Sequence, residues 1–272
     1  MSRTVKAEAE ADFTSEDIVR FLLEETSTFD PPTNAEKIAR YLQLEIRGFF
    51  HQEYNLDPKI RAYLWPARRE IGIARMLSQH RKKFSILHEV GHFVIPGHLN
   101  NLAQDEKLLD DDRSLSDNSV VKMEMDANRF AANCMFQLDR FQADVDKVEL
   151  SWRKISRLAG RYDASIIATA RRWVEDSLAT CALVVFVPIT LGDKKRLRYS
   201  YTIASESFRS RYFARLTGLT LPEGSTAFRA FRDTSGDAGL VQRLSVDIDD
   251  RPYDFDMMLF STLYNVYGLI VP

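Results

Sequence analysis

Apolar and polar residues alternate with two different periods along this chain. As far as about residue 177, apolar side chains recur mainly at the three- and four-residue spacing of amphipathic helices. Three strand-like runs interrupt this pattern, at residues 44–49, 61–65 and 70–76. Beyond Leu178 the period moves towards two, most clearly at residues 197–203 and 244–248. The pattern predicts an α+β chain in which helices with a small sheet precede a second, sheet-containing region.

Capping and breaking residues set the limits of the first helices. Thr14 and Ser15 open one helix, and the two prolines at 31–32 stop the chain before the next. Thr33 and Glu36 have the spacing of a capping box, so we expect them to start the second helix.

Three later segments complete the helical part. One helix begins near Lys82 and ends before Pro96, because the residue before a proline is pushed out of the helical region. The acidic, apolar-poor residues 104–118 predict a surface loop, and an amphipathic helix follows over 119–137. Two short helices between residues 150 and 175 flank the turn GRYDAS.

The composition excludes several classes of protein. A length of 272 residues allows two domains, and a net charge of −2 gives the whole chain no electrostatic affinity for nucleic acid or a membrane. Cys134 and Cys181 lie far apart, which argues against a disulfide framework. The first thirteen residues lack the apolar core of a signal peptide, and the longest apolar run, 181–191, is too short for a bilayer. We therefore expect a cytoplasmic protein with no membrane partner.

The segment KKFSILHEVGHFVIPGH, residues 82–98, has the spacing of a metal site. His88 and His92 are four residues apart, so on a helix they lie within ~40° of each other and about 6 Å apart along the axis. Both imidazoles can then bind one tetrahedral ion. Glu89 is rotated by ~100° from His88, so it is placed to take a proton from water rather than to bind the ion. This pattern predicts a metal-dependent hydrolase with Glu89 as general base.

Glu124 is the first candidate for the third metal ligand. It lies on the helix expected over 119–137, and Asn128, four residues on, shares its face. A carboxylate on the metal and, one turn later, a group that accepts the N–H of a ligand histidine would form a gluzincin-like arrangement. Asp126 lies on the other side of that helix and is a poorer candidate.

His98 is the alternative third ligand. It follows His88 by ten residues, as in the pattern HExxHxxGxxH. That pattern needs a glycine at its seventh position, where the chain must turn sharply. Ile95 stands there, and the glycine is Gly97.

Three stretches between residues 28 and 137 occur in a characteristic order: DPPTNAEKIARYLQLEI, RKKFSILHEVGH and EMDANRFAANCM. Together they resemble the ImmA/IrrE metallopeptidases, whose signature E-x-E-A-N-x-F-A-A begins with a metal-binding acid. The resemblance assigns that role to Glu124. Asp126 departs from the family's second glutamate, and residues 134–137, CMFQ, depart from its usual leucine, leucine, methionine and proline.

The resemblance implies a division into a gluzincin-like metallopeptidase domain over 1–145, a helix-turn-helix-like segment over 146–177 and a mixed α/β, GAF-like sensor domain over 178–272. It implies a cytoplasmic endopeptidase that cleaves a helix-turn-helix transcriptional repressor in a stress or mobile-element response. The expected cofactor is Zn²⁺, although Mn²⁺ or Fe²⁺ accepts similar ligands. The last domain would bind a small molecule or another signal.

Two other functions are alternatives. The protein could be a non-proteolytic regulator with a structural or vestigial metal site, but the presence of Glu89 favours an enzyme. It could also bind DNA directly through residues 150–175, which contain six Lys and Arg residues. The apolar start of the second helix, residues 166–168, favours a packed hairpin over a DNA surface.

Overall fold

The computed structural model describes residues 14–54, 56–99, 108–110, 118–146, 149–212, 219–233, 236, 239–248 and 251–272. The chain divides into two compact units, one of residues 1–141 with 161–164 and one of residues 142–160 with 165–272. Helices and sheets both occur, which confirms the predicted α+β class. The three-part division of the chain at residues 145 and 177 stays a prediction.

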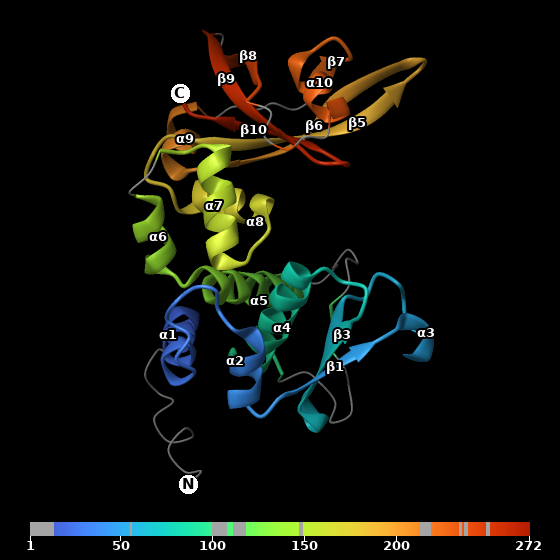
Figure 1. The fold of residues 1–272 in the computed structure, drawn as a ribbon, viewed down its shortest axis with the longest axis vertical. Coiled ribbons are helices and arrows are strands. Elements are labelled where there is room, and N and C mark those ends of the chain that lie inside the picture. The colour runs from blue at the N-terminus through green and yellow to red at the C-terminus, as the bar shows by residue number, and fades with distance from the viewer. Residues whose placement is uncertain are drawn as a thin grey trace. The chain divides into compact units, whose positions relative to one another are not determined.

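The first unit combines helices with a four-stranded sheet (Figure 1). Its helices are α1 (Ser15–Glu25), α2 (Ala35–Tyr41), α3 (His51–Tyr54), α4 (Gln79–Val94) and α5 (Asn118–Phe136), with a 3₁₀ turn at Pro66–Arg68. Its strands are β1 (Glu45–Phe49), β2 (Ala62–Trp65), β3 (Glu70–Ala74) and β4 (Leu108–Asp110). Residues 139–141 of the helix α6 (Asp139–Val145) belong to the first unit and residues 142–145 to the second.

The small sheet has the strand order β1-β3-β2-β4. β1 runs parallel to β3, with Glu45 opposite Glu70, and β2 runs antiparallel to both β3 and β4. All five residues of β3 are buried. A Cβ added at Gly72 in this strand would lie only 2.1 Å from the ring of Tyr63 on β2. The ring therefore packs directly on the backbone of Gly72.

Helices α4 and α5 pack side by side, and α4 also contacts β2 and β3 (Figure 1). Gly91 lies at the contact between the helices. A Cβ added there would lie 3.1 Å from the ring of Phe130 and 3.3 Å from the Cα of Ala127. The missing side chain therefore lets the backbones of α4 and α5 approach closely.

Replacing Gly91 with valine is expected to separate α4 from α5 and to lower the free energy of unfolding by about 1–3 kcal/mol, the usual cost of overpacking. Urea denaturation measures this change. Gly160→Val is the matched control, because a Cβ at Gly160 in α7 meets nothing within 4 Å. Equal free-energy changes in the two variants would contradict the close approach of the helices.

The second unit is a six-stranded antiparallel sheet with helices on both faces. Its strands are β5 (Ala182–Leu191), β6 (Lys194–Ala204), β7 (Thr220–Pro222), β8 (Val241–Ile248), β9 (Arg251–Ser261) and β10 (Val266–Ile270), in the order β7-β6-β5-β10-β9-β8. Its helices are α7 (Trp152–Tyr162, except its last two residues), α8 (Ile166–Asp176), α9 (Glu206–Tyr212) and α10 (Thr226–Asp233).

The two faces of this sheet have different partners. Leu259 and Phe260 are adjacent on β9 and so point to opposite faces. Leu259 belongs to the core formed with α9 and α10, which includes Phe208 and Phe228. Phe260 contacts Trp152 of α7, with ring centroids 4.8 Å apart. The helices α7 and α8 therefore cover one face, and α9 and α10 cover the other.

The predicted strand segments overlap strands of the structure. The strand-like runs at 44–49, 61–65 and 70–76 correspond to β1, β2 and β3, and the alternation at 197–203 and 244–248 corresponds to β6 and β8. The GAF-like assignment of the second sheet stays a prediction. Cys134 and Cys181 are both free thiols. In the described part of the chain, no helix is long and apolar enough to cross a membrane.

Two local predictions were wrong. The capping box of Thr33 and Glu36 does not form, because Asn34 is the N-cap of α2 and its Oδ1 accepts from the amide of Lys37 at 2.8 Å. The Thr33 hydroxyl instead donates to the carbonyl of Cys134 at 2.7 Å. The predicted loop over 104–118 contains the strand β4, while residues 104–107 and 111–117 lie outside the described residues.

Candidate metal centre

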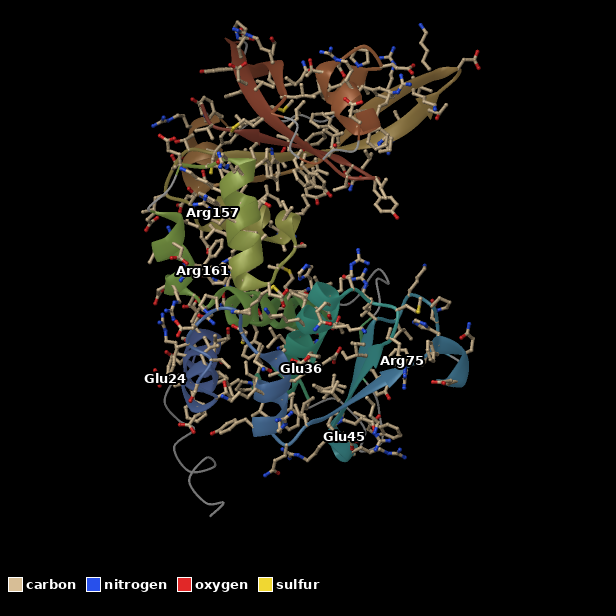
Figure 2. The ribbon with its side chains drawn as sticks, viewed as in Figure 1. Glu24, Glu36, Glu45, Arg75, Arg157 and Arg161 are labelled. Atoms are coloured by element: carbon tan, nitrogen blue, oxygen red, sulfur yellow. The ribbon has the colours of Figure 1, made fainter. Side chains whose placement is uncertain are left out.

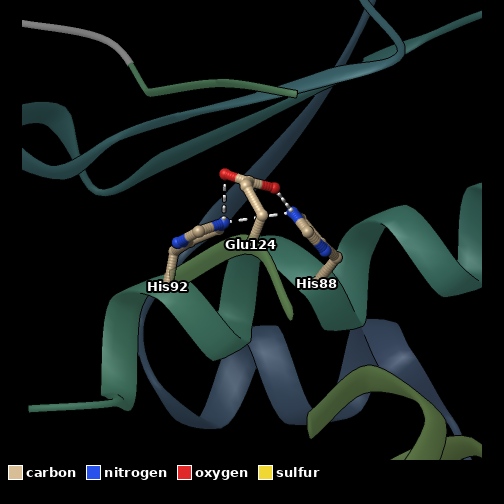
Figure 3. Close-up of side chains that lie close together, drawn as sticks. All are labelled: His88, His92 and Glu124. Atoms are coloured by element: carbon tan, nitrogen blue, oxygen red, sulfur yellow. Dashed lines mark hydrogen bonds and ion pairs between the residues drawn. The ribbon is translucent and has the colours of Figure 1, made fainter. Parts of the chain in front are cut away.

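The helix α4 carries His88 and His92 on one face, and α5 brings Glu124 opposite them (Figure 3). The two Nε2 atoms lie 3.0 Å apart. Glu124 Oε2 lies 3.2 Å from the Nε2 of His88, and Oε1 lies 3.3 Å from the Nε2 of His92. Three ligand-type groups from two helices therefore converge on one point.

The spacing of these atoms fits a single divalent ion. In a tetrahedral site with metal–ligand distances of about 2.0–2.1 Å, neighbouring ligand atoms are about 3.3 Å apart. The 3.0–3.3 Å separations between the imidazole nitrogens and the carboxylate oxygens are close to this value. Among the described residues, these three are the set of His, Cys, Asp and Glu side chains placed to hold an ion.

The electrostatics of the cluster favour an ionised carboxylate. Burial alone would raise the pKa of Glu124. The hydrogen bonds and charges of His88 and His92 outweigh burial and lower that pKa from 4.5 to about 2. Glu124 therefore carries a negative charge at neutral pH, which is the form that binds a metal.

Each histidine of the pair also makes a contact through its other ring nitrogen. The Nδ1 of His88 lies 3.1 Å from the Oδ1 of Asn128. The Nδ1 of His92 lies 3.1 Å from the Nδ1 of His98. Asn128 thus occupies the position that the sequence predicted for a partner of a ligand histidine, whereas His98 contacts the ring edge of His92 that faces away from Glu124.

The turn after α4 explains the position of His98. Ile95 caps the helix, and Gly97 has a φ of +88°, a left-handed conformation that a glycine adopts without strain. The amide of His98 donates to the carbonyl of Ile95 at 3.3 Å. This turn brings His98 against His92 and not into the cluster of ligand atoms, so the geometry does not support His98 as the third ligand.

Burial lowers the pKa of His98, and the charge of His92 lowers it further. Asp126 and Glu124 oppose this effect only in part. This shift favours the neutral imidazole, in which one ring nitrogen can accept a hydrogen bond.

Glu89 follows His88 on α4 and has no exposed surface. Bulk water does not reach a carboxylate in this position, so it does not compete for the oxygens that accept a proton. Its role as general base stays a prediction, as do the metal-binding roles of His88, His92 and Glu124.

Sequence reasoning missed Lys83, a buried cation on the same helix. Its ammonium donates to the carbonyl of Tyr162 at 2.9 Å and lies 3.5 Å from the carboxylate of Asp163. Burial lowers the pKa of Lys83, and Asp163 partly offsets the effect. The signal was its place four residues before the buried Leu87, on the apolar stripe of α4.

The helices α7 and α8 give little support to direct DNA binding. Arg157 and Arg161 lie on the same side of α7 (Figure 2). On α8, however, both arginines form ion pairs within the helix, Arg171 with Glu175 and Arg172 with Asp176. Buried residues such as Trp173 hold α8 against its sheet.

Comparison with known proteins identifies the part of the chain that contains the site. Residues 50–174 match the family model of Peptidase M78, described as an IrrE N-terminal-like domain. The chain contains an IrrE N-terminal-like domain. Two of the three stretches that carry the resemblance to ImmA/IrrE proteins lie inside the match, and the first, near residues 30–46, lies before it. The predicted family is confirmed.

A solved structure described as a Mycobacterium tuberculosis transcriptional regulator is similar in fold. The two chains share 13% sequence identity with a TM-score of 0.55, over 94% of this chain and 75% of that one. No curated protein matches the chain. The Peptidase M78 family is metal-dependent, so the IrrE N-terminal-like domain and the cluster of His88, His92 and Glu124 point to the same chemistry.

Proposed function

We propose that this chain is a metal-dependent endopeptidase with His88, His92 and Glu124 as metal ligands and Glu89 as general base. The observation that carries the proposal is the convergence of two imidazole nitrogens and a carboxylate within 3.0–3.3 Å in a Peptidase M78 domain. Zn²⁺ is the proposed ion, because two imidazoles and one carboxylate that leave an open position are typical of catalytic zinc. Mn²⁺ and Fe²⁺ accept the same donors.

The residues of the chain divide the chemistry between them. When bound, the ion supplies Lewis acidity, which makes water nucleophilic near neutral pH and polarises the scissile carbonyl. Glu89 accepts the proton of the attacking water and returns it to the nitrogen of the leaving amine. Asn128 accepts the Nδ1–H of His88, which leaves the Nε2 of that ring free of a proton and facing Glu124.

We further propose a gluzincin-like domain that acts on a protein substrate, a helix-turn-helix transcriptional repressor, in a cytoplasmic stress or mobile-element response. The motif resemblance supports this substrate class. The second sheet, with helices on both faces, is proposed to be a GAF-like sensor that binds a small-molecule or other signal.

Metal-dependent cleavage tests the proposal. Protein loaded with Zn²⁺ is expected to cleave members of a quenched-fluorescence peptide library, and dipicolinate should reduce the rate to background until Zn²⁺ is added back. Cleavage that continues undiminished after the ion is removed would contradict a metal-dependent mechanism. Absence of cleavage by fully loaded protein would favour a non-proteolytic regulator with a structural ion.

A further inference from the structure

Both histidines of the pair are held at two points, one on each ring nitrogen. The Nε2 atoms face Glu124, and the Nδ1 atoms face Asn128 and His98. His92 and His98 are almost fully buried, with 1% and 4% of their surfaces exposed. Their ring centroids lie 5.1 Å apart. Water therefore has little access to the contact between the two rings.

The positions of the protons follow from the chemistry of imidazole. A nitrogen that binds a metal must carry no proton, and in a neutral ring the other nitrogen then carries it. When an ion is bound between the Nε2 of His92 and Glu124, that Nε2 carries no proton, so the Nδ1 of His92 carries it and donates to His98. The Nδ1 of His98 must accept, so the proton of this second ring lies on its Nε2.

We propose that His98 is a positioning residue: its Nδ1 accepts the Nδ1–H of His92 and so fixes the tautomer and the orientation of that ring. Asn128 makes the equivalent contact with His88. The inference rests on the metal binding in the proposed function, but not on proteolysis. In this arrangement His98 is not a metal ligand. Its Nδ1 accepts the proton of His92 on the ring edge that faces away from Glu124, and its Nε2 carries a proton of its own.

The backbone supplies independent support for this role. His98 is held by the turn after α4, where Gly97 is left-handed and the amide of His98 bonds to Ile95. A side chain fixed by its own turn and buried against another ring loses little entropy when it orients that ring.

Zn²⁺ affinity, measured by competition with a chromophoric chelator, tests the proposal. His98→Leu removes the acceptor and is expected to weaken binding about 10–100-fold, the usual loss for a partner of a ligand histidine. His98→Asn places an amide oxygen near the lost Nδ1 and should recover most of the affinity. Asn128→Leu is the matched comparison at the other histidine and should lose affinity on the same scale.

Nitrogen NMR of the Zn²⁺-loaded wild-type protein gives a readout that does not depend on a variant folding. His98 is expected to carry its proton on Nε2 and none on Nδ1. The opposite tautomer, or His98→Leu with wild-type affinity, would overturn the proposal. A loss of more than about a thousandfold together with one fewer histidine in X-ray absorption would instead make His98 a ligand. If the wild-type protein binds no Zn²⁺, the proposed function itself fails.

Discussion

Glu89→Gln is expected to abolish proteolysis while leaving the metal bound. Glutamine has nearly the same shape as glutamate but cannot accept the proton of the attacking water. Loss of a general base typically reduces the rate by about 10²–10⁴-fold. His88, His92 and Glu124 are unchanged, so Zn²⁺ content should stay at the wild-type level. The measurement is kcat on a cleaved library peptide, with metal content determined on the same sample.

Glu36→Gln on α2 is the control for the loss of one carboxylate, because Glu36 is exposed on the surface of the first unit (Figure 2). It should retain wild-type kcat. Proteolysis by Glu89→Gln within a few-fold of wild type would remove Glu89 from the mechanism. Loss of metal from Glu89→Gln would show instead that this residue helps to hold the ion.

Removal of the metal is expected to destabilise the protein strongly. An ion that binds only the folded state, present at a thousand times its Kd, stabilises that state by about 4 kcal/mol. For a unit of about 150 residues this corresponds to a fall in Tm of roughly 8–16 °C when a chelator removes the ion. Differential scanning calorimetry with and without Zn²⁺ measures the change.

Glu124→Gln should lose most of this thermal shift, because the ionised carboxylate is one of the three ligands. Asp126→Asn is the matched control, since it changes an acid two residues away on the same helix and outside the ligand cluster. It should keep the shift. If the thermal shift disappears in Asp126→Asn but persists in Glu124→Gln, the metal ligand is Asp126 and the assignment of Glu124 is wrong.

The sequence predicted the parts of the site that depend on local geometry. The spacing of His88 and His92 fixes their relative position once a helix forms, and the helix requires only its own periodicity. Glu124 was predicted from a second periodic segment and a family signature. Its distance from the rings, however, depends on the close packing of α4 against α5, which Gly91 permits.

Features that depend on tertiary contacts were missed or misjudged. Thr33 has the spacing of a cap, but its hydroxyl bonds to the distant carbonyl of Cys134, and Asn34 caps the helix instead. The strand β4 has only three residues and no pattern of its own, and it is defined by pairing with β2. The contact of His98 with His92 was not predicted either, because it depends on the turn through Gly97.

We propose that one divalent ion is held by two imidazoles of α4 and a carboxylate of α5. Anomalous scattering at the zinc edge, from crystals of the Zn²⁺-loaded protein, tests it most directly. The account predicts a single strong peak at about 2.0–2.2 Å from the Nε2 atoms of His88 and His92 and from an oxygen of Glu124. A peak on other residues, or none at this cluster in fully loaded protein, would contradict it.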